Sequence, residues 1–151
     1  MSEIFSIELL VKKLDNYKRL HEIIIELDNY FMPKLSLLVD IDKYVGKMFD
    51  NAHIYILKDK SIDIGLCAIY LNDIRRKVAF ITLLGLLPKY QSMGLGSKLI
   101  KNVIEKSKEE GFLAIELEVS KGNFKAKNFY YKNGFAIKEE REKSLILSKN
   151  I

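Results

Sequence analysis

The chain has 151 residues, of which 48% are hydrophobic and 30% are charged. This length and balance are typical of one ordinary globular domain with a sizeable core, so we expect a single domain over residues 1–151 and no second one. The 25 basic and 20 acidic side chains give a net charge of +5. That charge suits an anionic ligand or an acidic substrate, but it is mild for a dedicated nucleic-acid binder, so we expect no nucleic-acid partner.

Cysteine content and hydropathy narrow the class further. Cys67 is the only cysteine, which excludes an intramolecular disulfide, and its place in the apolar stretch 64–71 predicts a buried core residue. The N-terminal segment has no signal-cleavage pattern, and no apolar run approaches membrane-spanning length. We therefore expect a cytoplasmic protein without a membrane partner.

The first third of the chain alternates between strand and helix patterns. Residues 4–12 are typical of a strand, and residues 16–31 carry apolar side chains at helical spacing until Pro33 interrupts the pattern. Residues 41–51 predict a second, shorter helix.

An antiparallel meander follows. Residues 53–58 and 63–71 are rich in branched and aromatic side chains and flank a polar segment, which predicts a hairpin. A polar turn at 72–77 then leads into a third strand at 78–87.

After Pro88 the antiparallel strands give way to a helix followed by a strand. Residues 94–110 place apolar side chains on one face of a helix, and Gly111 is a good helix stop. A crossover helix of this kind makes the next predicted strand, residues 112–119, parallel to the strand before it.

The C-terminal part contains one more helix and two strands. The helix covers residues 123–134, with Asn123 as its cap and Gly134 at its end, and the strands cover 135–140 and 144–149. The fold class is therefore α+β with a mixed sheet.

The start of the helix at 94–110 has the features of an anion site. Gly94 and Gly96 lie in its first turn, where glycines let the backbone approach a phosphate and the free amides point along the positive end of the helix dipole. A dinucleotide fingerprint fails because Leu99 stands at its last position, and a P-loop fails because the letters read Gly-Ser-Lys.

The same residues resemble the GNAT family of N-acetyltransferases. Its signature, Gln/Arg-x-x-Gly-x-Gly/Ala, is matched by residues 91–96, "QSMGLG". Upstream, "LGLLPKY" (84–90) resembles the fourth strand of the family, and "LEVSKGNFKAKNFYYKNGF" (117–135) resembles its fifth strand and the helix that follows. The resemblance implies a mixed sheet of about six to seven strands, with a splay between strands 4 and 5, flanked by about four helices.

The resemblance also implies acetyl-CoA as the acetyl donor. In the family the pyrophosphate lies on the amides of the signature loop, and a bulge in the fourth strand frees backbone groups for the pantetheine arm. Gly85 inside a strand fits such a bulge, although a glycine that permits close helix packing is the alternative. Asn123 has two plausible roles, as a helix cap and as a ligand of the pantetheine arm. The implied cofactor-binding residues are Leu84, Gly85, Leu86, Gln91, Ser92, Met93, Gly94, Leu95, Gly96, Ser97, Asn123 and Tyr130.

The implied chemistry is attack of an amine on a thioester, which requires a base. An alkylamine with a pKa of about 10.4 is almost wholly protonated at neutral pH. Glu118 matches a position used as the base in some family members, and Glu116 points to the same side of the strand. Ordered water is a further alternative, and both carboxylates are also explained as a polar strand face.

Departure of the thiolate requires an acid, and Tyr130 has the register of the family's general acid relative to Asn123 and Phe135. A phenol with a pKa of about 10 stays protonated at pH 7 and can donate to the CoA sulfur. The adjacent Tyr131 is rotated by about 100° around the helix and faces elsewhere. A core aromatic is the alternative for Tyr130.

The acceptor is not encoded in any readable motif. Tyr30, Phe31, Asp40 and Asp42 are candidates for an amine-bearing substrate, but a packed loop and an acidic helix N-terminus explain them equally well. We expect no metal, because no ligand cluster is present, and a monomer or homodimer. The leading hypothesis is an acetyltransferase of a small amine; acetylation of a protein N-terminus or lysine and a non-catalytic acyl-CoA-binding module are the alternatives.

Overall fold

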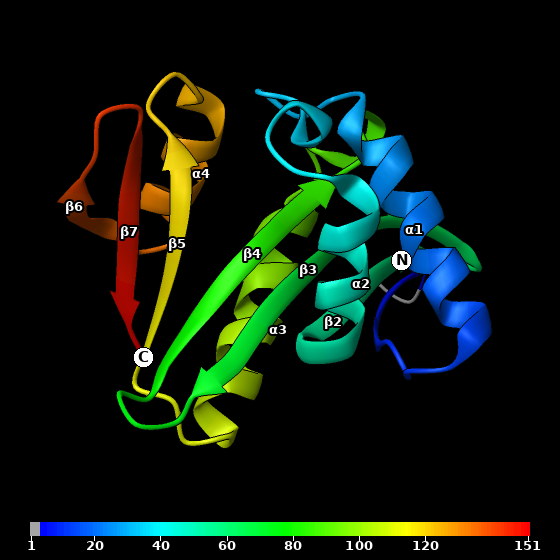
Figure 1. Ribbon diagram of the computed structural model, residues 1–151, viewed down its shortest axis with the longest axis horizontal. Helices are drawn as coiled ribbons and strands as arrows, with labels where there is room; N and C mark the ends of the chain where they lie inside the picture. The colour runs from blue at the N-terminus through cyan, green and yellow to red at the C-terminus, as the bar shows by residue number, and fades with distance from the viewer. Residues whose placement is uncertain (1–3) are drawn as a thin grey trace.

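The computed structural model describes residues 4–151 and arranges them in three layers. A seven-stranded mixed sheet with the order β1-β2-β3-β4-β5-β7-β6 forms the middle layer. Helices α1 and α2 cover one face of β2, β3 and β4, and α3 and α4 lie on the opposite face of the sheet (Figure 1). The predicted fold class, with its mixed sheet and four helices, is confirmed.

The predicted elements are all present. The strands are β1 (Phe5–Leu9), β2 (His53–Asp59), β3 (Ile62–Asp73), β4 (Val78–Leu86), β5 (Ala114–Ser120), β6 (Ala136–Glu140) and β7 (Ser144–Asn150). The helices are α1 (Leu14–Asp28), α2 (Ile41–Asn51), α3 (Leu95–Glu109) and α4 (Phe124–Lys132), with short 3₁₀ helices η2 (Leu35–Leu37) and η3 (Pro88–Tyr90). In this part of the chain, residues 4–151, no helix is long and apolar enough to cross a lipid bilayer.

The first strand and the first helix differ from the prediction at their ends. The strand stops at Leu9 rather than at residue 12, and α1 ends at Asp28 rather than at residue 31. The buried carboxylate of Asp28 accepts hydrogen bonds from the backbone N–H groups of Leu35, at 2.5 Å, and Ser36, at 3.2 Å. The chain therefore folds back onto the end of α1 instead of extending the helix toward Pro33.

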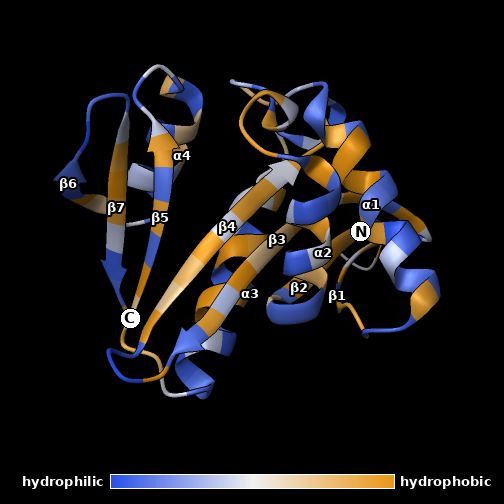
Figure 2. Ribbon diagram, viewed as in Figure 1, coloured by the Kyte–Doolittle hydropathy of each residue, from blue (hydrophilic) through white to orange (hydrophobic). Residues whose placement is uncertain are grey.

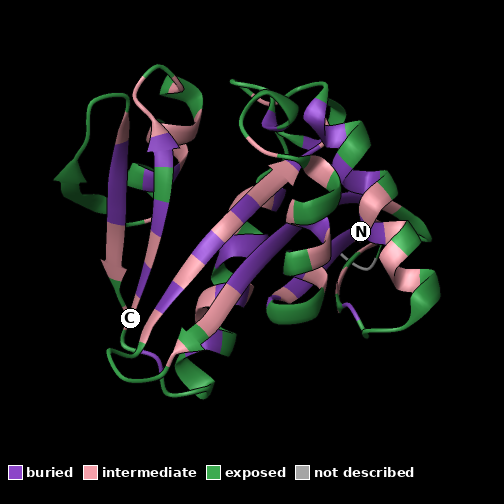
Figure 3. Ribbon diagram, in the orientation of Figure 1, coloured by how far each residue is buried: buried purple, intermediate pink, exposed green. Residues whose placement is uncertain are grey.

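Two apolar clusters hold the layers together, one on each face of the sheet. One lies between the sheet and α1 and α2, and the other lies between the sheet and α3 and α4. The helices carry both apolar and polar residues (Figure 2), and their buried apolar side chains pack against the sheet, whereas the edge strand β6 is exposed along its whole length (Figure 3). Cys67 is fully buried in the second cluster, where burial raises the pKa of its thiol, so the prediction of a core cysteine is confirmed.

Strands β4 and β5 pair only over their first halves. Their parallel register runs from Val78 opposite Ala114 to Ile81 opposite Leu117 and then stops. Beyond that point the two strands diverge, as the widening gap between their ribbons shows (Figure 1). The predicted splay between the fourth and fifth strands is therefore present.

The splay begins at a β-bulge. Ala68 of β3 faces Leu83 and Ile69 faces Ile81, which leaves Thr82 as the extra residue on β4. The hydroxyl of Tyr44 on α2 donates to the Thr82 carbonyl at 2.8 Å and lies 2.7 Å from Thr82 Oγ1. Burial raises the pKa of Tyr44 to about 12, which keeps this hydroxyl protonated.

The expectation that Gly85 forms the bulge is wrong. Gly85 is in regular register opposite Leu66, three residues beyond Thr82. A Cβ at Gly85 would lie 2.8 Å from the ring of Phe31, so this glycine makes room for an aromatic side chain of the α1–η2 loop. The alternative explanation of Gly85, close packing, is therefore the one the structure supports, with the Phe31 ring nearest and Leu27 of α1 next, at 3.5 Å from such a Cβ.

Candidate active site

A cleft of about 660 Å³ opens where β4 and β5 diverge. Its walls come from the loop after α1, the end of β4, the segment that enters α3 and the first turns of α4. The residues that line it are Tyr30, Phe31, Met32, Leu84, Gly85, Leu86, Gln91, Ser92, Gly94, Gly96, Ser97, Gly122, Asn123, Phe124, Lys125, Ala126, Phe129, Tyr130 and Lys132.

The entry to α3 presents free backbone donors to this cleft. Gly94 is the N-cap residue with φ +73°, a left-handed conformation that glycine adopts without strain. Among residues 4–151, the backbone hydrogen bonds outside helices and strands include none donated by the amides of residues 92–97. These N–H groups lie at the positive end of the α3 dipole and are therefore suited to an anion.

The charge of the cleft agrees with an anionic ligand. The lining contains two lysines, Lys125 and Lys132, and no aspartate or glutamate. Within the described part of the chain, residues 4–151, neither lysine takes part in a salt bridge. Free amides and unpaired cations together fit a phosphate-bearing molecule such as CoA.

Most residues predicted to bind the cofactor lie together at this cleft. Two do not line it: Met93 is 53% exposed, and the side chain of Leu95 is buried in the core. The family resemblance implies that both residues bind the pyrophosphate through their backbone amides, so the positions of their side chains do not bear on that role. The predicted residues that line the cleft are Leu84, Gly85, Leu86, Gln91, Ser92, Gly94, Gly96, Ser97, Asn123 and Tyr130.

Asn123 is already engaged on both sides of its amide. Its Oδ1 accepts from the Ala126 backbone N–H at 3.1 Å, which is the predicted N-cap of α4. Its Nδ2 donates to the Met32 carbonyl at 3.2 Å and so joins α4 to the loop after α1. Because the side-chain NH₂ group has two N–H donors, the one not bonded to Met32 is left for a pantetheine arm.

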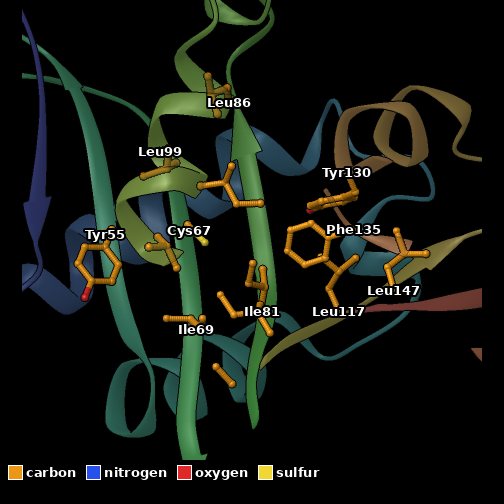
Figure 4. Close-up of a cluster of buried hydrophobic side chains, with 14 of the residues drawn as sticks. Tyr55, Cys67, Ile69, Ile81, Leu86, Leu99, Leu117, Tyr130, Phe135 and Leu147 are labelled. Atoms are coloured by element: carbon orange, nitrogen blue, oxygen red, sulfur yellow. The ribbon is translucent and has the colours of Figure 1, made fainter. Parts of the chain in front are cut away.

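Tyr130 lies on the second turn of α4 with its ring against Phe135, at a centroid distance of 5.6 Å. The side chain is 8% exposed, and its hydroxyl end lies on the side of β4 (Figure 4). Burial, with a smaller contribution from the Cys67 thiol, raises the pKa of the phenol above its usual value of 10.0. Among the hydrogen bonds of residues 4–151, none involves this hydroxyl, so it is available to a ligand in the cleft.

Glu118 and Glu116 lie apart from this lining. Leu117 points toward the core beneath α3 and α4. Glu116 and Glu118 point to the opposite face of β5, which is the face of the sheet that α1 and α2 cover, and they do not line the cleft. Glu118 accepts from the Ser144 hydroxyl at 2.5 Å and from Arg141 at 3.4 Å, and its side chain is 44% exposed. Glu116 is paired with Lys138 and is 12% exposed.

The candidate acceptor residues separate into two groups. Tyr30 and Phe31 line the cleft. Asp40 instead caps α2 by accepting from the Lys43 backbone N–H at 3.2 Å, and Asp42 lies 2.8 Å from His21 Nε2. The acidic pair therefore has a local structural role, as an acidic helix N-terminus predicts.

Sequence reasoning missed Lys125 and Lys132. A lysine on a helix is usually solvated, and only the close approach of α4 to α3 brings these two to the cleft. Their spacing of seven residues, two helical turns, was the available signal that they share a face. Among the described residues, no three His, Cys, Asp or Glu side chains form a group that could hold a metal ion.

Comparisons with known proteins agree with this geometry. Residues 18–135 match the model of the acetyltransferase (GNAT) family. A search of curated protein sequences gave no match. Among solved structures, the PaiA N-acetyltransferase of Thermoplasma acidophilum in complex with coenzyme A is 19% identical with a TM-score of 0.78, and the alignment covers 97% of this chain and 99% of that one.

Two further structures have the same fold. The ribosomal-protein-S18-alanine N-acetyltransferase of Escherichia coli is 17% identical with a TM-score of 0.77 over 97% of this chain and 94% of that one. A GNAT acetyltransferase of Elizabethkingia anophelis with acetyl-CoA bound is 17% identical with a TM-score of 0.75 over 99% of both chains. Because the family match spans more than half of its residues, the chain belongs to the GNAT family and is an acetyl-CoA-dependent N-acetyltransferase.

Proposed function

We propose that this protein moves the acetyl group of acetyl-CoA to a primary amine of a small molecule, such as an amino sugar, with Tyr130 as the general acid and Glu118 as the general base. The observation that carries the proposal is the cleft at the splay of β4 and β5, which combines free amides, two lysines and the Tyr130 hydroxyl. Acetyl-CoA supplies the activated acetyl group as a thioester.

The chain's own groups bind and orient the donor. The backbone N–H groups of residues 92–97 donate hydrogen bonds to the pyrophosphate oxygens at the positive end of α3. The end of β4, residues 84–86, offers its backbone to the pantetheine arm because β4 no longer pairs with β5 there. These contacts hold the thioester at the base of the splay, next to Tyr130.

Proton transfer is divided between the two faces of β5. Glu118 removes a proton from the acceptor ammonium, directly or through water, on the face shared with α1 and α2. Tyr130 donates its proton to the departing sulfur from the other face. The raised pKa of Tyr130 favours the protonated phenol that this role needs.

A small acceptor is the proposed class because contacts of the two walls with each other join them across the cleft. The hydrogen bond from Asn123 to Met32 bridges the two walls, and Phe31 packs over Gly85 beside it.

The experiment that tests the proposal is a screen of acceptors by release of free thiol from acetyl-CoA. The panel contains amino sugars, polyamines, amino acids, and peptides with a free N-terminus or a lysine. Turnover with a small amine supports the proposal, and turnover with peptides alone contradicts its acceptor class. Tight binding of acetyl-CoA without turnover of any acceptor favours the non-catalytic module.

The left-handed turn at Gly94 should be required for CoA binding. We expect Gly94→Val to raise the Kd of CoA at least about tenfold, because a branched side chain disfavours a positive φ and displaces the amides that meet the pyrophosphate. Isothermal titration calorimetry measures the Kd. Gly94→Asn is the control, since asparagine tolerates this conformation. If both variants bound CoA with the Kd of the wild-type protein, the pyrophosphate would have to bind elsewhere.

Loss of the Tyr130 hydroxyl should reduce catalysis and preserve binding. Tyr130→Phe removes one oxygen atom and leaves the ring packed against Phe135. We expect kcat to fall by at least about tenfold when chemistry limits turnover, because general acid catalysis contributes about 10² to 10⁴ in rate. Tyr131→Phe is the matched control on the adjacent residue. Full activity of Tyr130→Phe together with damage in Tyr131→Phe would refute the assignment of the acid.

The role of Glu118 should be visible in the pH–rate profile. We expect Glu118→Gln to lower kcat/KM most near neutral pH, where the acceptor is protonated. The deficit should shrink as pH rises toward the amine pKa of about 10.4, because less of the acceptor then needs a base. Steady-state kinetics between pH 6 and about 10 measure the profile. Glu116→Gln is the control, and a Glu118→Gln profile parallel to the wild type would assign the role to water or Glu116.

A further inference from the structure

Gln91 links the end of β4 to the first turn of α4 through both ends of its amide. Its Nε2 donates to the Leu86 carbonyl at 2.9 Å, and its Oε1 accepts from Lys125 Nζ at 2.5 Å. Gln91 and Lys125 both line the cleft. The bond to Leu86 fixes the direction of the Gln91 amide, and that amide fixes the ammonium of Lys125.

The partner of Lys125 leaves its charge uncompensated. Two lysines on the neighbouring C-terminal part of the sheet are paired with carboxylates, Lys121 with Glu140 and Lys138 with Glu116. Lys125 takes part in no salt bridge among residues 4–151 and is instead held by a neutral amide oxygen. A neutral acceptor orients an ammonium group and preserves its full attraction for an anion.

The position of Lys125 matches the anion site at α3. Gln91 immediately precedes the free amides of residues 92–97, so its Oε1 brings the ammonium of Lys125 to the edge of that loop. A lysine side chain normally loses much rotamer freedom when it binds a phosphate. The bond to Gln91 imposes part of that order before a ligand arrives, which lowers the entropic cost of binding.

We infer that Lys125 binds the pyrophosphate of CoA and that Gln91 is a positioning residue that holds it there. This inference rests on the proposed use of acetyl-CoA at this cleft. The family resemblance implies that Gln91 binds the cofactor itself. In this inference the Gln91 side chain instead contacts Leu86 and Lys125, and Lys125 makes the contact with phosphate.

Calorimetric titrations with CoA, dephospho-CoA, which lacks the 3′-phosphate, and pantetheine, which lacks all phosphates, test the inference. We expect Lys125→Met to raise the Kd of CoA and dephospho-CoA by the same factor, about tenfold or more, and to leave pantetheine binding unchanged. Lys127→Met is the matched control on the same helix, because Lys127 lies over the ring of Phe124 and does not line the cleft.

A double-mutant cycle tests the role of Gln91. Gln91→Met should weaken CoA binding in the wild-type background and have a clearly smaller effect when Lys125→Met is present, because the two residues act as one unit. Lys125→Arg should recover part of the affinity, since it restores the positive charge.

Three results would overturn the inference. If Lys125→Met bound CoA with unchanged affinity, Lys125 would not contact the pyrophosphate. If the variant lost affinity for CoA but not for dephospho-CoA, Lys125 would contact the 3′-phosphate instead. An equal loss for pantetheine would show that Lys125 only supports the fold of α4. Failure of the wild type to bind CoA would instead contradict the proposed function itself.

Discussion

The bulge at Thr82 is the constraint on which the cleft depends. If β4 and β5 continued to pair beyond Ile81, their backbone groups would satisfy each other and the two strands would close the site. The extra residue turns β4 away, and the Tyr44 hydroxyl on α2 holds both polar groups of Thr82 in that arrangement. Backbone donors and acceptors beyond the bulge then lack a partner on β5, so they favour water or a ligand chain in its place.

Helix α4 completes the cleft because it is fixed to the first turn of α3. A Cβ on Gly96 would lie 3.0 Å from the Phe129 ring, so glycine at this position allows the two helices to approach closely. Asn133 adds a hydrogen bond of 3.3 Å to the Ser97 hydroxyl. The glycine thus allows the packing of the helix that carries Tyr130 and Lys125, and it also leaves the α3 amides open to the anion proposed to bind there.

The order of the elements and the glycine-rich start of α3 follow from local patterns, so the sequence predicted them. Apolar spacing indicates α3 and β5, and glycine favours the positive φ found at Gly94. The position of the bulge could not be predicted, because it is set by the register against β3, and Gly85 indicated a bulge where an aromatic ring packs. The link from Gln91 to Lys125 joins residues 34 positions apart and is visible only in three dimensions.

The two proposed proton-transfer groups differ in environment because β5 separates them. Leu117 faces the core that contains Tyr130, and Glu118 faces the opposite side, toward water. Burial keeps the phenol protonated until a developing thiolate draws its proton. The exposed carboxylate, held by Ser144 and Arg141, can pass the proton it accepts to solvent. Strand β5 therefore separates the two proposed groups: Glu118 lies on its exposed face, and Tyr130 packs from α4 against the core on the opposite face.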